Sequence, residues 1–570
     1  MGLALARVVV LANICCTAAD ARMQVTRGRR MTLADEGAEL PVVDVCIVGA
    51  GPVGLALALS CEARGLSVIL LETGALDGPS NAEENFAPVE YTNGHHATAG
   101  ATSRGVGGTS ALWGGRCVEF DDLDFAKRAH VPHSGWPITH SDLRDHYAAA
   151  FAFLNCGAHY AHLDGKEIRG GDVETLTIER WSARPALGPL YKAHLQASAR
   201  ITLLTEATAV GIELDPMGLH VETIRVHRRG RMLQVRAKNH VLACGGLENA
   251  RLLLATQRDW PRKFGGSDGA LGRFYQGHVT GHISIIELAD SMLEKALLFQ
   301  KDRDGRHFRR RLQINARTQL DNALLNAAFW LDGLSISDAA HSSGAFSALY
   351  LPLAISGLYG MLSEGRAPKT GNGRYHRYRE HLRNVRSDPA LLRDLASSAG
   401  NFLGSRFRGR RTVPSPKGRY LLRYHAEQTP TRESRVCLSN RQSSAFLPAL
   451  KVNYLVDDSD AVSVVRSHQL LDRWLRENGM GRLDYLQETP ERGDAVRRQA
   501  FDGYHQIGLT RMSEHPTDGV VNTDCRLHDL SNLYVAGSAV FPTGGQANPT
   551  LPAVALALRL GAHLAARPHP

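Results

Sequence analysis

Val43-Asp44-Val45-Cys46-Ile47-Val48-Gly49-Ala50-Gly51-Pro52-Val53-Gly54 is the stretch that decides the fold. Its apolar first half predicts a buried strand, and a helix is expected from Leu55 to Arg64. Between them, Gly49 permits a tight turn, Gly51 lets a pyrophosphate approach the backbone, and Gly54 allows close packing of helix and sheet. Free N–H groups at the start of the helix would face the phosphates. The stretch therefore indicates a dinucleotide-binding turn.

A second predicted strand, Ser67 to Leu71, ends next to Glu72. An acidic side chain at this position can hydrogen-bond a ribose hydroxyl. The glycines alone would also suit a plain turn in another α/β protein, but the order of strand, turn, helix, strand and acid is far more specific. We therefore predict that Glu72 completes the dinucleotide site.

The composition is that of an ordinary soluble globular protein, with 43% hydrophobic and 22% charged residues in a chain of 570. A formal charge of +9 is modest for this length, and neither a basic helix interleaved with aromatics nor a zinc-finger spacing occurs. Nucleic-acid binding is therefore not expected. The nine cysteines show no C-x-x-C and no metal-ligand pattern, which favours a reducing compartment, a cytoplasmic location and no metal site.

Residues 1–40 are expected to be a disordered or mis-assigned leader. Residues 1–21 carry an arginine, a short apolar run and an Ala-Asp-Ala end, which resembles a weak secretory signal. If that signal is real, the protein is periplasmic or secreted. An alternative start is Met31. No uninterrupted span of ~20 apolar residues occurs, so a transmembrane helix is not supported.

A second glycine-rich stretch runs from Arg104 to Arg116 and contains five glycines. It suggests backbone that lies against something flat or charged, and the hydroxyls of Thr109 and Ser110 could bond to it. The alternative is a plain surface loop. Further on, residues 201–256 alternate between strands and a helix, including a predicted hairpin of 221–227 with 232–237. This alternation predicts that one nucleotide-binding sheet is assembled from separated segments.

Residues 290–425 are long and basic, with Arg309-Arg310-Arg311 as an example, and they include an apolar stretch from Ala345 to Leu362 that Pro352 interrupts. One interpretation is a core or lid segment with a solvated basic face. The other is an apolar and basic surface, within 345–411, that sits on an anionic membrane or binds a large anionic glycan.

The C-terminal part combines strands, a helix and two glycine-bounded loops. Residues 435–439 and 450–455 alternate like antiparallel strands, and 460–477 is an amphipathic helix. His505 and Asn548 then each sit in a glycine-bounded loop. A lone histidine is usually structural, but these two loops near the C-terminus favour a functional role for both residues.

The chain resembles the glucose–methanol–choline (GMC) oxidoreductases. The resemblance rests on the first glycine turn with Glu72, the Arg104–Gly115 loop, Gly245-Gly246-Leu247-Glu248-Asn249, Leu271-Gly272-Arg273-Phe274 and the His505 and Asn548 loops. It covers roughly residues 41–285 and 425–567. It implies an α/β fold, α+β overall, in which a Rossmann-like FAD domain is built from separated segments and joined to a substrate domain with an antiparallel sheet.

The implied domain limits are 41–285 mainly for FAD binding, 286–500 mainly for substrate, with 290–425 as a basic and apolar insert, and 501–570 for a C-terminal FAD and active-site segment. The resemblance also implies an enzyme that passes hydride from an alcohol carbon to flavin N5, with His505 as the general base and Asn548 holding the substrate oxygen. Gln428 is a weaker candidate for lining the substrate pocket. The candidate FAD-binding residues are Gly49, Gly51, Gly54, Glu72, Arg104, Gly108, Thr109, Ser110, Val210, Gly537, Asn548, Pro549 and Thr550.

One departure from the family is informative. Sugar oxidases of similar pattern carry a histidine in the second flavin loop that bonds covalently to FAD, and the matching position here is Leu112. The resemblance therefore implies dissociable FAD. Trp136-Pro137-Ile138 and Asn548-Pro549-Thr550 resemble the branch that oxidises sugars and glycosides, which favours a sugar, glycoside or polyol hydroxyl as substrate.

Other substrates and classes stay open: a sterol, a terpenoid or an aminocyclitol within the same family, a flavin monooxygenase, or a flavin-binding protein without turnover. Against a monooxygenase, the late flavin loop runs from Gly537-Ser538 to Pro542 and lacks a Gly-Asp turn. The electron acceptor, whether O2, a quinone or a cytochrome, cannot be read from the residues.

Overall fold

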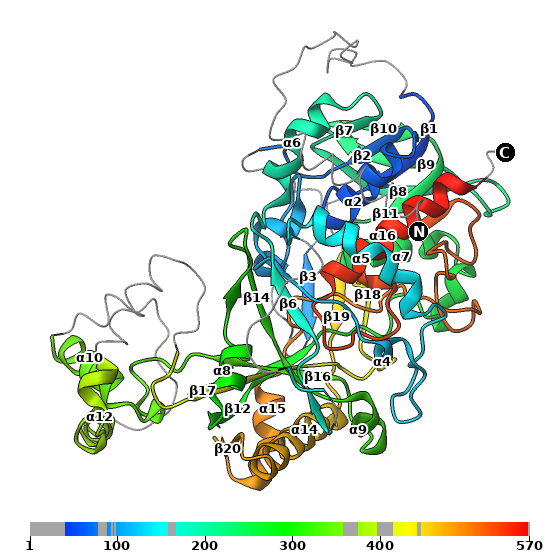
Figure 1. The fold of residues 1–570 in the computed structure, drawn as a ribbon. Coiled ribbons are helices and arrows are strands. Elements are labelled where there is room, and N and C mark those ends of the chain that lie inside the picture. Colours follow the sequence, from blue (N-terminus) through cyan, green and yellow to red (C-terminus); the bar gives the residue numbers. More distant parts are fainter. Residues whose placement is uncertain are drawn as a thin grey trace.

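The computed structural model describes residues 40–77, 88–92, 95, 98–157, 167–169, 171–356, 374–395, 414–441 and 446–567. The predicted leader, apart from Leu40, lies outside the described residues. Helices and strands are mixed, and they form a nucleotide-binding part around a parallel sheet and a second part around a large antiparallel sheet (Figure 1). The α/β fold expected from the sequence is confirmed.

A five-stranded parallel sheet forms the centre of the first part. Every neighbouring pair in it is parallel, and β1 is almost entirely buried, which explains its run of apolar residues. Because its strands come from distant parts of the chain, the predicted assembly from separated segments is confirmed. The strand order is β21 (Leu533–Val535), β11 (Ala237–Leu242), β1 (Val43–Val48), β2 (Val68–Leu71) and β7 (Ile201–Leu204).

Two helices from opposite ends of the chain pack together on this sheet. They are α2 (Pro52–Glu62) and α16 (Thr550–Ala566), which lie side by side in Figure 1. Their contact depends on small residues: a Cβ on Gly561 would collide with Ser60 on α2. This contact therefore holds α2 and α16, which come from the first and the last segments of the domain, in one helical layer on the sheet.

An antiparallel three-stranded sheet joins the nucleotide-binding part. It contains β8 (Ala207–Leu214), β9 (Val221–Arg228) and β10 (Arg231–Val235). Arg231 pairs with Arg228 across the turn, so the predicted hairpin is confirmed. Within the described part of residues 98–259, the α-helices are α3 (Thr98–Ala101), α4 (Asp122–Phe125), α5 (His140–Phe153), α6 (Leu187–Ala197) and α7 (Gly246–Asp259).

A six-stranded antiparallel sheet forms the second part. Helices α14 (Asp458–Glu477) and α15 (Arg492–Gln499) pack on it and bury residues such as Leu471 and Val496 (Figure 1). The antiparallel sheet predicted for this part is therefore present. Its strand order is β20 (Gly481–Tyr485), β12 (Val279–Leu288), β17 (Arg419–Ala426), β16 (Ala327–Asp332), β15 (Leu312–Ile314) and β5 (Val173–Glu174).

Two smaller sheets connect the two parts. In one, β18 (Arg435–Leu438) and β19 (Leu450–Asn453) pair antiparallel, as the sequence predicted, and β3 (Val89–Thr92) joins them. The other sheet draws strands from both halves of the chain: β13 (Gln300–Lys301), β14 (His307–Arg310), β6 (Ile178–Trp181) and β4 (Arg116–Cys117). Segment 116–181 therefore contributes β4 and β6 to this sheet and β5 to the six-stranded sheet, and the predicted domain limits stay a prediction.

The three consecutive arginines 309–311 are buried, which corrects their interpretation as part of a solvated basic face. Arg309 Nε and Arg311 Nη1 lie 2.6 and 3.0 Å from the carboxylate of Glu179. Burial alone would raise the pKa of Glu179, but Arg116, Arg309 and Arg311 outweigh it and lower the pKa to about 2. The sequence showed the cations but not the buried carboxylate that pairs with them.

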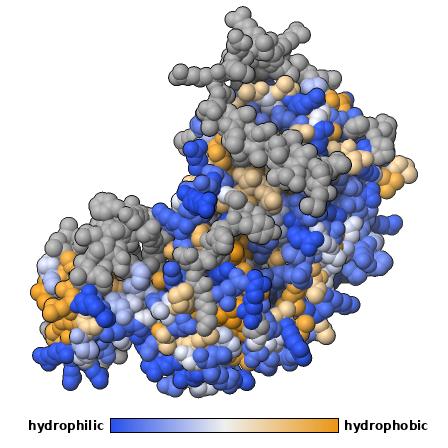
Figure 2. Space-filling model, viewed as in Figure 1, coloured by the Kyte–Doolittle hydropathy of each residue, from blue (hydrophilic) through white to orange (hydrophobic). Residues whose placement is uncertain are grey.

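Helices α10 (Gly344–Ile355) and α12 (Arg374–Ser387) form an arm at the left of Figure 1, where Figure 2 shows apolar side chains at the surface. Ile355, at the end of α10, is 78% exposed. Residues 357–373 and 396–411, which belong to the predicted membrane-binding surface, lie outside the described residues. Across the described ranges, every helix is too short or too polar to traverse a bilayer.

Candidate active site

A cavity of about 810 Å³ lies where the nucleotide-binding part meets the second part. One end is formed by the two glycine-rich turns and Glu72, and the other by the His505 and Asn548 loops. The predicted site residues that line it are Gly49, Gly51, Glu72, Arg104, Gly108, Thr109, His505, Gly537, Asn548, Pro549 and Thr550. The structure thus brings most of the predicted site residues into one space.

The first glycine turn shows three different steric situations. Gly49 has φ +104°, and a Cβ there would lie 2.7 Å from the carbonyl oxygen of Ala243. A Cβ on Gly54 would collide with the carbonyl of Gly49, whereas a Cβ on Gly51 would meet no atom within 4 Å and would project into open space. Gly51 is therefore the position where a phosphate can approach the backbone, at the uncapped start of α2.

Glu72 is buried at the end of β2 and holds three loops together. Its carboxylate accepts the backbone N–H groups of Ala50, Gly74 and Gly105 at 2.8–2.9 Å. Burial raises its pKa, while these three donors act in the opposite direction. A carboxylate offers about four acceptor positions, so one remains for a ribose hydroxyl. Glu72 can thus serve a ribose while fixing the second glycine loop against the first.

The second glycine loop lies directly on the first. Gly108 has φ +50°, and a Cβ there would lie 2.9 Å from the Cα of Gly51. Leu112 lines the cavity and is 55% exposed. Ser110 instead points away from the cavity lining: its hydroxyl donates to the carbonyl of Gly107 and accepts the N–H of Leu187. Ser110 therefore shapes the loop from behind.

Three other predicted residues do not line the cavity. Gly54 is a packing position, and Val210 is buried on β8, next to Ala209, which does line the cavity. Gln428 is 1% exposed, and its amide is used inside the protein: Oε1 accepts from the Gly277 N–H and from the Tyr454 hydroxyl, and Nε2 donates to the Leu455 carbonyl. Gln428 thus supports the backbone beside the cavity, where the sequence predicted that it would line the substrate pocket.

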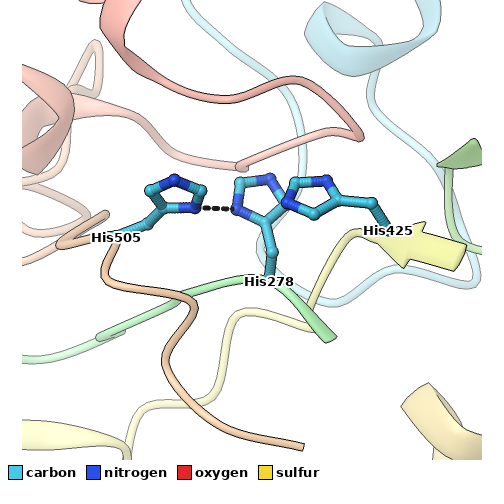
Figure 3. Close-up of side chains that lie close together, drawn as sticks. All are labelled: His278, His425 and His505. Carbon is cyan, nitrogen blue, oxygen red and sulfur yellow. Dashed lines mark hydrogen bonds between the residues drawn. The ribbon is translucent and has the colours of Figure 1, made fainter. Parts of the chain in front are cut away.

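His505 is held by a backbone contact between the two parts. Gln276 and Ile507 exchange both backbone hydrogen bonds in an antiparallel bridge. Continuing this register by two residues places His278 opposite His505. The imidazole Nδ1 atoms of the two histidines lie 2.7 Å apart. Figure 3 draws the hydrogen bond between these two rings as a dashed line. The antiparallel pairing therefore determines which side chain stands behind the predicted base.

The other ring nitrogen of His505 meets Asn548. Asn548 Nδ2 lies 3.3 Å from His505 Nε2. An amide NH2 only donates, so Nε2 carries a lone pair. Burial lowers the pKa of His505 well below its usual range, and His278 and Arg116 lower it further. His505 is therefore neutral, with an unprotonated nitrogen beside Asn548.

A third histidine, His425 on β17, completes the cluster in Figure 3. Its ring stacks on His278 at 4.2 Å and 20°, and its Nδ1–H donates to the Gln546 carbonyl. Burial lowers the pKa of His278 to about 4 and that of His425 well below its usual range. Sequence reasoning missed His278 and His425. Only the pairing of β12 with β17, which places Thr280 opposite His425, brings them together.

One nitrogen from each of the three rings lies within 4.8 Å of the others. Metal ligands must direct their lone pairs at one point. The nearly parallel rings of His278 and His425 direct theirs side by side, and His425 Nδ1 is already bound to Gln546. The cluster therefore consists of one hydrogen-bonded pair, His278 and His505, with His425 stacked on His278. The absence of a metal site remains a prediction.

Comparison with known proteins agrees with this site. Residues 430–557 match the family model of GMC oxidoreductases. The chain is 35% identical over 132 residues to a C-glycoside 3-oxidase of Arthrobacter globiformis, an alignment that covers 22% of this chain and 23% of that protein. It is 21% identical to a 2-methyl-1,2-propanediol dehydrogenase of Mycolicibacterium austroafricanum (92% and 95% covered) and 23% identical to a 6'''-hydroxyparomomycin C oxidase of Streptomyces lividus (92% of each).

Among solved structures, pyridoxine 4-oxidase from Mesorbium loti aligns with a TM-score of 0.49 at 16% identity, over 92% of this chain and 100% of that chain. The family model covers the segment that carries both His505 and Asn548. This chain therefore carries the C-terminal domain of the GMC oxidoreductases, a family of FAD-dependent enzymes.

Proposed function

We propose that this protein oxidises a hydroxyl of a sugar, glycoside or polyol to the carbonyl. The observation that carries the proposal is the pair of His505 and Asn548 at one end of a cavity whose other end has the glycine turns and acid of a dinucleotide site. The names of the relatives, a glycoside oxidase, a diol dehydrogenase and an aminoglycoside oxidase, support an alcohol as substrate.

The residues present fit FAD. Gly51 leaves room for the pyrophosphate at the start of α2, Glu72 keeps an acceptor for the ribose, and the Arg104–Gly115 loop, Gly537 and Pro549 line the rest of the cavity. When bound, FAD supplies an acceptor for the hydride of an alcohol carbon. The protein must therefore place that carbon and remove the hydroxyl proton.

His505 performs the second task. Its Nε2 carries a lone pair next to the cavity, and its depressed pKa keeps it neutral well below pH 6.5. Nε2 takes the hydroxyl proton as the hydride leaves the carbon. Asn548 orients the substrate oxygen with its amide. Its Oδ1 has no hydrogen-bond partner among the described residues and can accept from a second hydroxyl.

We further propose that FAD is held without a covalent bond. Leu112, at the edge of the cavity, has no nucleophilic atom to form one. Denaturing the yellow protein and passing it through a membrane filter tests this: the flavin is expected in the filtrate. Flavin that stays with the denatured chain would contradict the proposal.

Aminocyclitols are the second candidate substrate class, because two relatives are named as a hydroxyparomomycin C oxidase and a paromamine 6'-oxidase. The positive charge of Arg116 disfavours aminocyclitols, whose amines are cationic. It lines the cavity, and its charge lowers the pKa values of His278, His425 and His505. A cationic amine would meet the same repulsion, so a neutral glycoside or polyol fits better.

Anaerobic flavin reduction tests the substrate class. FAD-loaded protein is mixed with glycosides, sugars, polyols, aminocyclitols, sterols and terpenoid alcohols, and bleaching near 450 nm is followed. We expect bleaching by a neutral carbohydrate. Bleaching by NADPH and by none of the alcohols would overturn the proposal in favour of a monooxygenase. Admitting air or quinone afterwards identifies the electron acceptor.

Location and membrane contact are also proposals. The seven described cysteines are free, which supports a cytoplasmic protein, and a secreted one is the alternative if residues 1–21 are cleaved. The exposed Ile355 on α10 and the exposed Arg379, Arg383 and Arg386 on α12 support peripheral contact with an anionic membrane. Sedimentation with anionic and neutral vesicles tests this: binding to anionic vesicles only is expected, and binding to neither would contradict it.

A further inference from the structure

We propose that His278 is a positioning residue that fixes the tautomer of His505: it accepts the Nδ1–H of His505 and so keeps Nε2 unprotonated toward the cavity. The inference rests on the proposed role of His505 as the base. In serine hydrolases a buried carboxylate orients the catalytic histidine in this way. Here a neutral imidazole takes that place.

The backbone forces the two rings together. The bridge between Gln276 and Ile507 puts His278 directly opposite His505. A Cβ on Gly277 would collide with the carbonyl of Asp502, so the two segments approach as closely as backbones can. Gln428 Oε1 accepts the N–H of Gly277 and holds the segment that precedes His278. The Nδ1–Nδ1 distance of 2.7 Å is that of a hydrogen bond.

The direction of this hydrogen bond follows from the contact with Asn548. Asn548 donates to His505 Nε2, so the single proton of the neutral His505 ring is on Nδ1. That Nδ1–H lies 2.7 Å from His278 Nδ1, so the neutral His278 ring accepts there and carries its own proton on Nε2. His505 Nδ1–H is therefore the donor.

Stacking holds the His278 ring in this orientation. His425 covers one face of it at 4.2 Å, while the ring of His505 stands at 87° to it. His425 is in turn fixed by the Gln546 carbonyl. The order is therefore Gln546, His425, His278 and His505, and the His505 ring presents its unprotonated Nε2 to Asn548 beside the cavity.

The charged groups around the three histidines explain why His278, the partner of His505, is neutral. Arg116 on β4 lowers the pKa of all three histidines, and Glu427, at the end of β17, raises that of His278. Glu427 is itself bound to Arg128 by two hydrogen bonds of 2.6–2.7 Å. Among the described residues, no carboxylate contacts His505. The imidazolium formed during turnover is therefore shared with His278 alone.

Two variants distinguish the role of the Nδ1 acceptor of His278 from the role of its aromatic ring. His278→Phe keeps a flat ring that can stack on His425 but removes the acceptor. His278→Asn loses the ring but keeps an oxygen near the position of Nδ1. His425→Phe is the matched control, because it changes a stacked ring of the same cluster that does not touch Nδ1 of His505.

Anaerobic flavin reduction is measured against pH for these variants and for His505→Ala. A general base contributes roughly 10²–10⁴-fold, so we expect His278→Phe to lose at least about 10²-fold and His278→Asn to stay within about 10-fold of the wild type. Above pH 4, His278 is neutral and its charge does not repel His505, so its Nδ1 acceptor stabilises the protonated His505 ring. Loss of this acceptor therefore lowers the pKa of His505 and moves the acid limb of the profile to lower pH. His425→Phe should leave that limb in place. A His278→Phe profile equal to that of the wild type would overturn the proposal.

Histidine ¹⁵N NMR gives a readout that does not need turnover. The His505 signals are assigned as those missing in His505→Ala. We expect the proton on Nδ1 in the wild type and in His278→Asn, and on Nε2 in a large share of His278→Phe. A proton on Nε2 in the wild type would overturn the inference. Flavin reduction that survives in His505→Ala would instead overturn the proposed function, so the two failures are distinct.

Discussion

The two ends of the cavity are built in different ways. At the nucleotide end, Gly49, Gly51 and Glu72 come from one short segment, and backbone N–H groups such as that of Ala50 hold the Glu72 carboxylate. At the other end, His278 and His505 are brought together by a single antiparallel bridge between distant segments. A site whose residues come from one short segment can be predicted from the sequence. A site that depends on the pairing register of distant segments cannot.

The difference also predicts how each end responds to change. The nucleotide end has steric limits set by backbone atoms that cannot move aside. At the histidine end, buried polar side chains form hydrogen bonds and ion pairs, so a substitution leaves a buried donor, acceptor or charge without its partner. Substitutions at the first should act on folding or on FAD binding, and substitutions at the second on stability, pH dependence and catalysis.

The largest effect is expected from a pair of glycines in the same turn. Gly54→Ala places a methyl group against the Gly49 carbonyl, so we expect no folded, yellow protein. Gly51→Ala adds the same methyl group where no atom lies within 4 Å, so the apoprotein should fold and lose affinity for FAD. Circular dichroism and FAD titration measure the two effects. Normal FAD affinity in Gly51→Ala would contradict the assignment of the phosphate position.

At the histidine end, the buried pair of Arg128 and Glu427 is the most sensitive contact. Both side chains are fully buried and are joined by two hydrogen bonds. Glu427→Gln leaves an uncompensated buried guanidinium, which should lower the free energy of unfolding by about 3–5 kcal/mol. Urea denaturation measures this. A loss below about 1 kcal/mol would show that the pair does not hold β17 in place.

A smaller effect is expected in the pH dependence of stability. Burial lowers the pKa values of His240, His278 and His468 to about 4. In the unfolded chain they titrate near 6.5, so between pH 6.5 and 4 the unfolded state binds more protons. Stability therefore falls as the pH falls, by about 1.4 kcal/mol per pH unit for each group.

The variant His278→Asn isolates one of these contributions. His194, whose pKa is raised by its hydrogen bond to Glu62, acts in the opposite direction, so a difference between two proteins is more informative than one profile. Urea midpoints between pH 6.5 and 5 should fall less steeply in His278→Asn than in the wild type. Identical slopes would mean that His278 is not held neutral by burial.

Much of the fold could be predicted from the sequence, because it depends on local signals. The apolar run of β1, the glycine turn and the tip of β2 at Glu72 lie where they were expected, and so does the hairpin at Arg228 and Arg231. Helix α16 begins at Thr550, directly after the Asn548 loop. His505 and Asn548, singled out because each lies in a glycine-bounded loop, line one cavity and contact each other, and their catalytic roles stay a prediction.

The remainder depends on contacts between distant segments. From the sequence alone, arginines 309–311 resemble a charged surface patch. The pairing of β14 with β6 places Glu179 beside Arg309, and the sequence does not show this pairing. Gln428 has the residue type of a substrate ligand, but its neighbours Gly277 and Tyr454 occupy the amide. His278 carries no local signal, since its role follows only from standing opposite His505.

The central claim is that His505, held by His278, removes the hydroxyl proton in an FAD-dependent alcohol oxidation. The most direct measurement is anaerobic stopped-flow flavin reduction by the best carbohydrate substrate, comparing the wild type with His505→Ala at equal FAD content. We expect bleaching at 450 nm in the wild type and a rate reduced by roughly 10²–10⁴-fold in the variant. A variant that holds FAD and is reduced at the wild-type rate would contradict the claim.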